Sequence, residues 1–262
     1  MKRASLVVAL LVSSLAFSYV LVSIRPLMFI VKELYPGQVQ VLIDPNSNPH
    51  MFSLTPSSMK KIYKSDILIV FGSGFEEWIK KVKANICYAA KGMDKEMDVN
   101  PHLWLNPKLM EKAVGNIKEC LEKVYPDKKD EIEKNYKRFL DKLEELDKKL
   151  RKDLSDKDGA ILELRPALYH FLKEYFKGKY YTVIGQTQSS LSARSLKDVI
   201  KVCKKRNLKK IIIEKSSSKK IALPLLRECK LKELEVDVLG ADVKSYEELI
   251  LCVEKIVLEA LK

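Results

Sequence analysis

The sequence predicts an α/β protein with two lobes that are joined by one long helix. Two sets of four short β-branched runs alternate with stretches of helical periodicity, and a charge-dense helical segment separates the two sets. Alternation of this kind is typical of β-α-β units, in which helices connect parallel strands. We therefore expect two roughly four-stranded parallel sheets, each flanked by helices.

The predicted strands are short apolar runs rich in valine and isoleucine. The first sheet is expected to contain Tyr19–Ile24, Val39–Ile43, Ile67–Phe71 and Ile86–Ala89. The second sheet is expected to contain Ala160–Leu164, Tyr180–Ile184, Lys210–Glu214 and Leu234–Leu239. Runs of this length and composition are typical of buried strands in a parallel sheet.

The segment between the two sets is predicted to be one uninterrupted helix. From Asp127 to Leu154 apolar residues recur every three or four positions, and no glycine or proline interrupts this segment. That spacing gives one apolar stripe on a helix about 40 Å long. We expect a signal peptide or short anchor at 1–16, an N-terminal lobe at 17–125, the connecting helix at 126–155 and a C-terminal lobe at 156–262.

The N-terminus resembles a secretory signal. Lys2 and Arg3 precede an apolar run, and the small residues of Ser14–Ala16 are typical of a cleavage site. The alternative is an uncleaved membrane anchor, because residues 4–24 carry no charge and could span a bilayer. We favour export, since Tyr19–Ile24 is also predicted to be a strand. No cysteine precedes Cys87, so an acyl anchor is not expected, and we place the protein outside the cytoplasmic membrane.

The charge and the motifs exclude several classes of protein. The net charge is +13, but the basic residues are mostly lysines scattered along the chain without interleaved aromatics. We interpret them as solvated surface and expect no nucleic-acid partner. No H-E-x-x-H, G-x-S-x-G or phosphate-binding glycine loop occurs in the sequence. We therefore expect a binding protein rather than an enzyme. We also expect it to be a monomer.

The five cysteines do not form a disulfide framework or a zinc-binding pattern. None belongs to a C-x-x-C pair, and their spacing is irregular. Cys120, Cys203 and Cys252 occupy apolar positions of helical patterns, so we expect them to be buried. Among the possible pairs, Cys203 with Cys229 is the first one to test.

Two of the three histidines follow predicted strands in matching settings. His50 and His102 each come after an Asn-Pro dipeptide, and Asp237 lies near the end of the last predicted strand. Ligands of open parallel sheets bind at the carboxyl ends of the strands. Two imidazoles and a carboxylate there predict a site for a divalent transition metal. The alternative is that both histidines cap helices or bond to the backbone.

These residues resemble motifs of the zinc- and manganese-binding solute receptors of ABC importers. Asn48–Pro56 and His102–Pro107 resemble the two histidine motifs of that family, and Gly72–Trp78 resembles its glycine-leucine-glutamate-x-tryptophan segment. Further similarities follow in order at Ala167 with Phe171, Ser192-Ala193, Ile213-Glu214 and Asp237–Gly240. The resemblance implies a receptor that delivers zinc or manganese to an ABC permease, with His50, His102 and Asp237 as metal ligands.

The sequence departs from the family at the third ligand. The family places a histidine or glutamate just after the first strand of the second lobe, and Arg165 stands there in this chain. An arginine cannot deprotonate and cannot bind a metal. We expect a site that is completed by water or that has changed its ligand, and Glu163 and His170 are the alternative third ligands. The alternative function is a binding or adhesion protein that has lost or changed its metal site.

Two further features leave the choice of metal and one residue's role open. Glu214 ends a predicted strand and is expected either to orient a histidine or to form a salt bridge. Zinc-selective members of the family often carry a long loop rich in histidine and acidic residues, and only Lys91–Asp98 occupies that place here. Two histidines suit zinc, whereas an added carboxylate and water would suit manganese.

Overall fold

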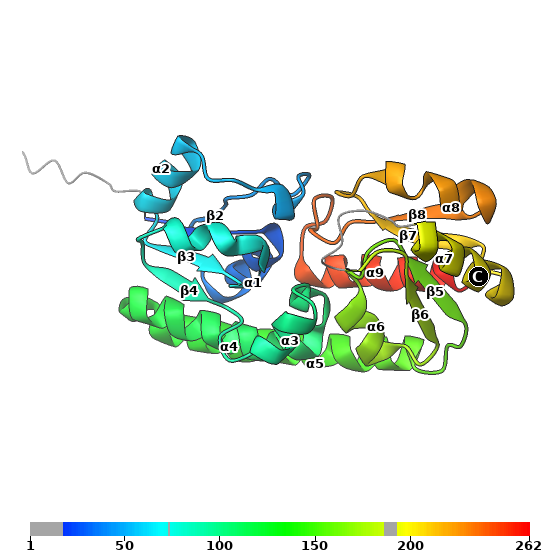
Figure 1. Ribbon diagram of the computed structural model, residues 1–262. Helices are drawn as coiled ribbons and strands as arrows, with labels where there is room; N and C mark the ends of the chain where they lie inside the picture. The colour runs from blue at the N-terminus through cyan, green and yellow to red at the C-terminus, as the bar shows by residue number, and fades with distance from the viewer. Residues whose placement is uncertain (1–17, 73, 186–192) are drawn as a thin grey trace, which may run out of the picture.

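A computed structural model describes residues 18–72, 74–185 and 193–262. Figure 1 shows two α/β lobes side by side, with a long helix running beneath both. The predicted fold class is therefore confirmed. The predicted signal peptide, most of the alternative anchor and Ser192 lie outside the described residues. Within the described residues, no helix is both long enough and apolar enough to cross a membrane.

The N-terminal lobe is built on a four-stranded parallel sheet. Its strands are β1 (Val20–Val22), β2 (Val39–Val41), β3 (Ile67–Val70) and β4 (Ile86–Tyr88), in the order β2-β1-β3-β4. Its helices are α1 (Arg25–Leu34), α2 (Pro56–Lys64) and α3 (Asp94–Val99). Every residue of the central strands β1 and β3 is buried, which explains their continuous apolar runs. All four predicted strands are present, each one to three residues shorter than its apolar run.

The C-terminal lobe repeats this architecture. Its strands are β5 (Ala160–Glu163), β6 (Lys179–Thr182), β7 (Lys210–Glu214) and β8 (Lys232–Val236), in the order β6-β5-β7-β8 and all parallel. Its helices are α6 (Tyr169–Tyr175), α7 (Ala193–Arg206), α8 (Leu223–Glu228) and α9 (Tyr246–Ala260). The predicted strands are again confirmed. β8 ends before Asp237, which is therefore the first residue of the following loop.

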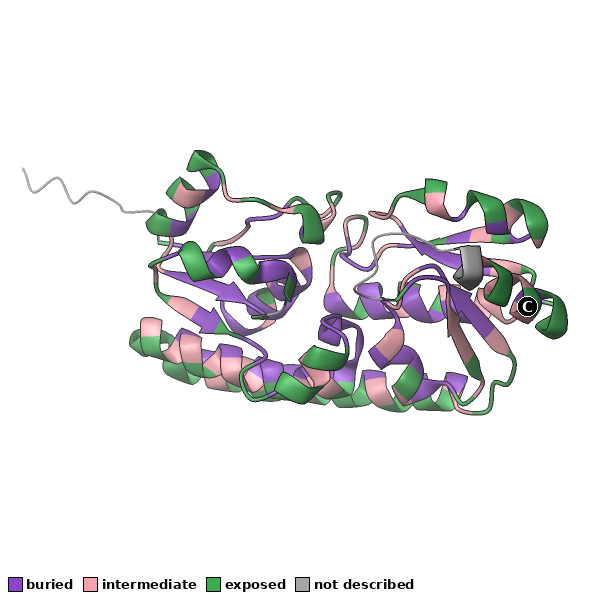
Figure 2. Cartoon of the chain, in the orientation of Figure 1, coloured by how far each residue is buried: buried purple, intermediate pink, exposed green. Residues whose placement is uncertain are grey.

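Two packed helices form the base of the molecule. Helix α4 (Pro107–Val124) contacts α5 (Lys129–Leu154) along its length. The predicted stripe on α5 is confirmed, because its buried residues are Ile132, Phe139, Leu143, Leu146, Leu150 and Leu154. The charged residues of α5 face the solvent, as the green outer surface in Figure 2 shows.

One hydrophobic core continues from the first lobe into the second. It includes β1 and β3, the buried stripe of α5, Val238 and the inner face of α9. A second, smaller core around Leu162, Ile213 and Leu225 lies within the C-terminal lobe alone. Because the lobes share apolar contacts, a change in their relative position would expose buried surface.

The cysteines differ from the sequence-based expectation. Cys87 of β4 and Cys120 of α4 form a disulfide, whereas Cys203, Cys229 and Cys252 are free. Cys203 is buried as expected, but Cys252 is exposed and the pair Cys203–Cys229 is not bonded. Helix α9 is apolar on most sides, so periodicity alone did not identify its buried face. The Cys87–Cys120 pairing depends on α4 packing beside β4, which a sequence pattern does not reveal.

Candidate metal centre

The structure brings His50 and His102 together at the carboxyl ends of the first sheet. His50 lies in the 3-10 turn Pro49–Met51 after β2, and His102 directly precedes the 3-10 turn Leu103–Leu105 after β4. Their ring centroids are 6.0 Å apart. His102 is buried and His50 is exposed. The two imidazoles can therefore face one shared ligand that solvent reaches on the His50 side.

Local backbone interactions hold His50 in place. The side chain of Asn48 accepts a hydrogen bond from the His50 backbone N–H at 3.0 Å. The ring of Pro49 fixes the backbone angle φ at the first residue of the turn. The ring of Phe75 packs edge-on against His50, with centroids 5.6 Å apart. These contacts explain why an Asn-Pro-His sequence gives a fixed histidine on a loop.

The segment Gly72–Trp78 supports the histidines from the neighbouring loop. The buried carboxylate of Glu76 accepts hydrogen bonds from the backbone N–H groups of Phe71 and Gly72, at 3.3 and 2.6 Å. Phe75, the residue before Glu76 in the 3-10 helix Gly74–Lys81, packs against His50 and against Trp104. Gly72 has a φ of +89°, a conformation that favours glycine. Glu76 thus acts on the site through the loop that carries Phe75.

Asn100 determines which nitrogen of His102 is available to a ligand. Its Oδ1 atom accepts from both the backbone N–H and the Nδ1–H of His102, each at 2.9 Å. Because Nδ1 donates to that oxygen, the lone pair of the neutral ring is on Nε2. Asn100 was not among the site residues predicted from the sequence. Its position two residues before a histidine is the signal that could have indicated this role.

Both imidazoles are held in their neutral form. Burial, together with the nearby His50 and His170 rings, lowers the pKa of His102 to about 3. The pKa of His50 is also lowered, first by loss of solvent around its ring and then by the positive charge of Arg165. A neutral imidazole is the form that binds a metal, so both rings are in this form at neutral pH.

Arg165 lies in the loop after β5, and its charge acts on residues of both lobes. Its positive charge influences His50 of the first lobe and Glu214 at the end of β7. Burial raises the pKa of Glu214 to about 7, while Arg165 and the hydroxyls of Ser216 and Ser217 oppose that shift. Of the two predicted roles for Glu214, the described contacts favour an electrostatic partner of Arg165.

The two alternative third ligands have other roles in the structure. The carboxylate of Glu163 is fully buried and accepts hydrogen bonds from the Leu168 backbone, at 3.1 Å, and from the Tyr180 hydroxyl. Burial raises its pKa well above the usual range. Nε2 of His170 faces two carbonyl oxygens, Asn100 O at 2.8 Å and Glu96 O at 3.1 Å, and must donate to them. Both residues therefore hold the loops that surround the cleft.

The carboxylate of Asp237 organises the loop after β8. Oδ1 accepts from the backbone N–H groups of Leu239 and Gly240, at 3.1 and 2.8 Å, and Oδ2 accepts from Asp242 N–H at 3.1 Å. Within residues 18–72, 74–185 and 193–262, no three His, Cys, Asp or Glu side chains are grouped as a metal site requires. Metal binding by Asp237 therefore stays a prediction.

Hydrogen bonds join the two lobes beside the histidines. Nδ2 of Asn100 donates to Pro166 O at 2.5 Å, so the residue that orients His102 also contacts the opposite lobe. Nε1 of Trp104 donates to Val238 O at 2.8 Å, and the Tyr246 hydroxyl donates to Trp104 O at 2.9 Å. The histidine cleft thus lies over a bonded contact between the lobes.

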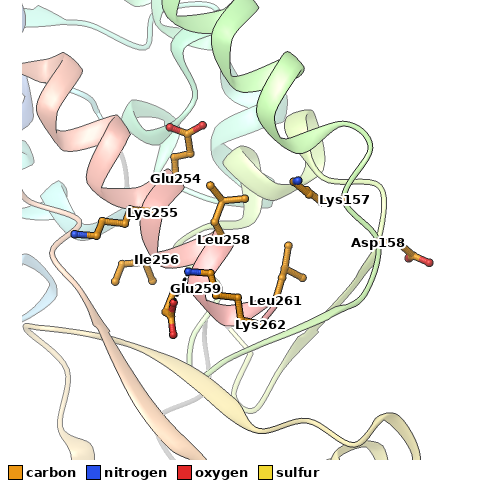
Figure 3. A pocket seen from close by; sticks show the side chains of 9 residues that line it. All are labelled: Lys157, Asp158, Glu254, Lys255, Ile256, Leu258, Glu259, Leu261 and Lys262. Carbon is orange, nitrogen blue, oxygen red and sulfur yellow. Dashed lines mark hydrogen bonds and ion pairs between the residues drawn. The ribbon is translucent and has the colours of Figure 1, made fainter.

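A separate hollow lies beside the last turns of α9, away from the histidines (Figure 3). Leu258 and Leu261 line it together with the turn at Lys157. Two of its three carboxylates pair with lysines, Glu254 with Lys149 at 2.8 Å and Glu259 with Lys210 at 2.8 Å. These pairs and the absence of an imidazole among the lining residues make it unsuitable for the predicted metal.

Comparison with known proteins identifies the family. Residues 20–256 match the profile of ZnuA, described as "Zinc-uptake complex component A periplasmic". The chain belongs to the ZnuA family. Membership of this family assigns it to the metal-binding receptors of zinc-uptake systems.

Individual relatives agree with this assignment to the ZnuA family. A protein of Thermotoga maritima named "Putative metal-binding protein" is 27% identical over 100% of both chains. The "High-affinity zinc uptake system protein ZnuA" of Bacillus subtilis is 26% identical over 73% of this chain and 68% of its own length. A crystal structure of ZnuA superposes with a TM-score of 0.83 and 25% identity, covering 94% of this chain and 99% of the other.

Proposed function

We propose that this chain is an extracytoplasmic receptor that binds zinc through Nε2 of His102 and a ring nitrogen of His50. It delivers the ion, as cargo, to an ABC permease in the membrane and acts as a monomer without catalytic activity. The observation that carries the proposal is the pair of neutral imidazoles, 6.0 Å apart between centroids, with His102 oriented by Asn100. Family membership supports the receptor role.

The geometry of the two rings supports a shared zinc ion. Zinc binds imidazole nitrogen at about 2.0–2.1 Å in a tetrahedral arrangement, so two ligating rings have centroids roughly 5 Å apart. The observed separation is about 1 Å larger, which a small rotation of the exposed His50 ring could close. Nitrogen donors favour zinc over manganese, which prefers oxygen ligands. Zinc is therefore the proposed cargo, and manganese is the alternative predicted from the sequence.

The coordination is completed by Asp237, by water or by a small anion. Asp237 can contribute only if its carboxylate binds the metal in addition to its hydrogen bonds to the loop backbone, or in place of some of them. An anion is favoured by Arg165, whose positive charge reaches His50 and would otherwise repel the cation. The competing function, a binding or adhesion protein with a lost or changed metal site, rests on the same arginine.

The test is zinc binding measured by calorimetry on the purified full chain. Replacing both histidines, in His50→Ala with His102→Ala, should abolish stoichiometric binding, because both proposed nitrogen donors are removed. His50→Ala alone is also informative, since His50 is exposed and its loss should leave the fold intact. His170→Gln is the matched control: it removes an imidazole outside the pair and keeps a donor for the carbonyl groups.

Two results would contradict the proposal. The first is stoichiometric zinc binding retained by the double variant, which would place the site elsewhere. The second is the absence of bound zinc or manganese from the natural protein, both by elemental analysis after purification without chelators and by calorimetry. That second result would support the lost or changed site.

A further inference from the structure

The net charge of the protein is concentrated in one part of the C-terminal lobe. Residues 196–232 contain thirteen lysines and arginines and three acidic residues, a net of +10 out of +13 for the whole chain. Lysines occur along the whole sequence, but their excess over acidic residues is concentrated in this segment. This segment runs from α7 through β7 and α8 to the start of β8.

The fold places two turns of this segment side by side. Helix α7 ends in a turn at Asn207 and α8 ends in a turn at Lys230, and both residues have a φ of +51°. The turns lead into the neighbouring parallel strands β7 and β8, in which Lys210 pairs with Lys232. The backbone N–H of Lys232 donates to Lys209 O at 2.7 Å and joins the two turns directly.

The basic side chains on these turns form one exposed group, which we call the basic edge. It consists of Lys204, Lys205, Arg206, Lys209, Arg227, Lys230 and Lys232. All seven are exposed, and none forms a salt bridge with a described residue. Other lysines of the segment are paired, for example Lys210 with Glu259 and Lys219 with Glu233. The basic edge therefore retains its charge for a partner.

The basic edge lies at the amino ends of β7 and β8 in the second sheet, whereas His50 and His102 follow strands of the first sheet. Glu214 and Asp237 stand at the carboxyl ends of β7 and β8, so about 15 Å of strand separates these residues from the basic edge. Figure 1 shows α7 and α8 in the part of the C-terminal lobe away from the N-terminal lobe, and Figure 2 shows their exposed surfaces. A partner bound at this edge would leave the cleft open.

We propose that the basic edge binds the anionic head groups of a phospholipid membrane. Clusters of four to eight lysines and arginines beside a membrane helix or on an amphipathic helix bind anionic lipid, and each such charge near the membrane surface contributes about 1 kcal/mol. The array follows two adjacent turns, so several of its charges can face one continuous negative surface. Because the edge is far from the cleft, this contact holds the protein at the membrane while the metal site stays accessible.

The chemistry of the edge favours lipid over other anionic partners. Residues 196–232 contain no Phe, Tyr or Trp, so the stacking platforms typical of single-stranded nucleic-acid sites are missing from this segment. Protein–protein interfaces are depleted in lysine and depend on aromatic or arginine anchors in pockets. Five of the seven residues of the edge are lysines, whose compact charge on a flexible stem suits mobile head groups.

The test is flotation of the full chain with vesicles of phosphatidylcholine, with or without about one-third phosphatidylglycerol. We expect the protein to bind the anionic vesicles, and salt to weaken the binding as it screens the charges. The edge variant combines Lys204→Gln, Lys205→Gln, Arg206→Gln and Lys209→Gln. It should lower partitioning into anionic vesicles by about tenfold or more.

A matched control removes the same charge elsewhere. The control variant combines Lys123→Gln, Lys129→Gln, Lys134→Gln and Arg138→Gln, which are also exposed and make no described salt bridge. It should bind anionic vesicles nearly as well as the natural chain. Both variants keep the apolar N-terminal residues, so any contribution of that segment is the same in each comparison.

Three outcomes would overturn the proposal. Equal binding to both vesicle types would show that charge does not direct the protein to the membrane. An equal loss in the edge and control variants would assign the effect to net charge alone. Competition by soluble polyglutamate as strong as that by vesicles of equal charge would assign the edge to an acidic protein. Zinc calorimetry on the edge variant should be unchanged, so this test is independent of the proposed function.

Discussion

At the scale of single residues, the cleft is determined by the partners that each titratable group has. Asn100 directs the lone pair of His102 to Nε2, and burial keeps that ring neutral. The carboxylate of Asp237 accepts hydrogen bonds from the backbone of its own loop, and the carboxylate of Glu163 accepts one from the backbone of the loop after β5. Arg165 brings a positive charge close to His50, and therefore to the proposed metal site.

Arg165→His should tighten zinc binding by at least about tenfold, or 1.4 kcal/mol. The substitution removes a charge whose repulsion of a divalent ion amounts to several kcal/mol at an effective dielectric constant of about 20, and it supplies an imidazole. Calorimetry at fixed pH measures the change. Arg165→Gln is the control, because it removes the charge without adding a ligand and should improve binding less. Unchanged or weaker binding by the histidine variant would show that Arg165 is not at the third-ligand position.

At the scale of the elements, the base of the first lobe is joined by a covalent bond. The disulfide between Cys87 and Cys120 links β4 to α4 and closes a loop with a sequence separation of 33. The loop that carries Asn100 and His102 lies inside this closed segment. The bond therefore restricts the unfolded chain around one half of the candidate site.

The variant Cys87→Ala with Cys120→Ala should lower the free energy of unfolding by about 3–4 kcal/mol, from the entropy of closing a loop of that length. Chemical denaturation of the oxidised natural chain and the variant measures the difference. Cys252→Ala is the control, because Cys252 is exposed and unpaired and its loss should change little. If the natural chain and the double variant unfold at the same denaturant concentration, the disulfide does not form.

At the scale of the whole molecule, the lobes behave as one body. They share a hydrophobic core, α5 runs beneath both, and hydrogen bonds of Asn100 and Trp104 cross between them. Hinge closure needs a few residues that absorb large backbone changes, and a continuous helix with a shared core resists it. Metal should therefore enter by small movements of loops and side chains.

Solution scattering with and without zinc tests this rigidity. We expect the radius of gyration to change by less than about 1 Å on binding, because the lobes cannot separate without exposing shared core. The His50→Ala, His102→Ala variant, with zinc added, is the control for effects of the metal on aggregation. A larger change in the natural chain alone would mean that the lobes move as separate bodies.

The sequence by itself determined the eight strands, the long helix and the two histidine motifs. These features depend on neighbours two to four positions apart, because strands and helices bury one face at fixed periods. The apolar runs of β1 and β3 and the stripe of α5 are of this kind. The Asn-Pro-His settings are also local, since Asn48 bonds to the turn that it begins.

Only the tertiary structure decided which residues far apart in the sequence are in contact. Examples are the Cys87–Cys120 disulfide and the hydrogen bond from Asn100 to Pro166, which depend on which surfaces pack together. The hydrogen bonds that Asp237 and Glu163 accept from nearby backbone depend on how the following loops fold back. The basic edge is of the same kind, because Lys209 and Lys232 meet only when β7 and β8 pair. No local period encodes such contacts, because packing sets distances between segments that the chain keeps far apart.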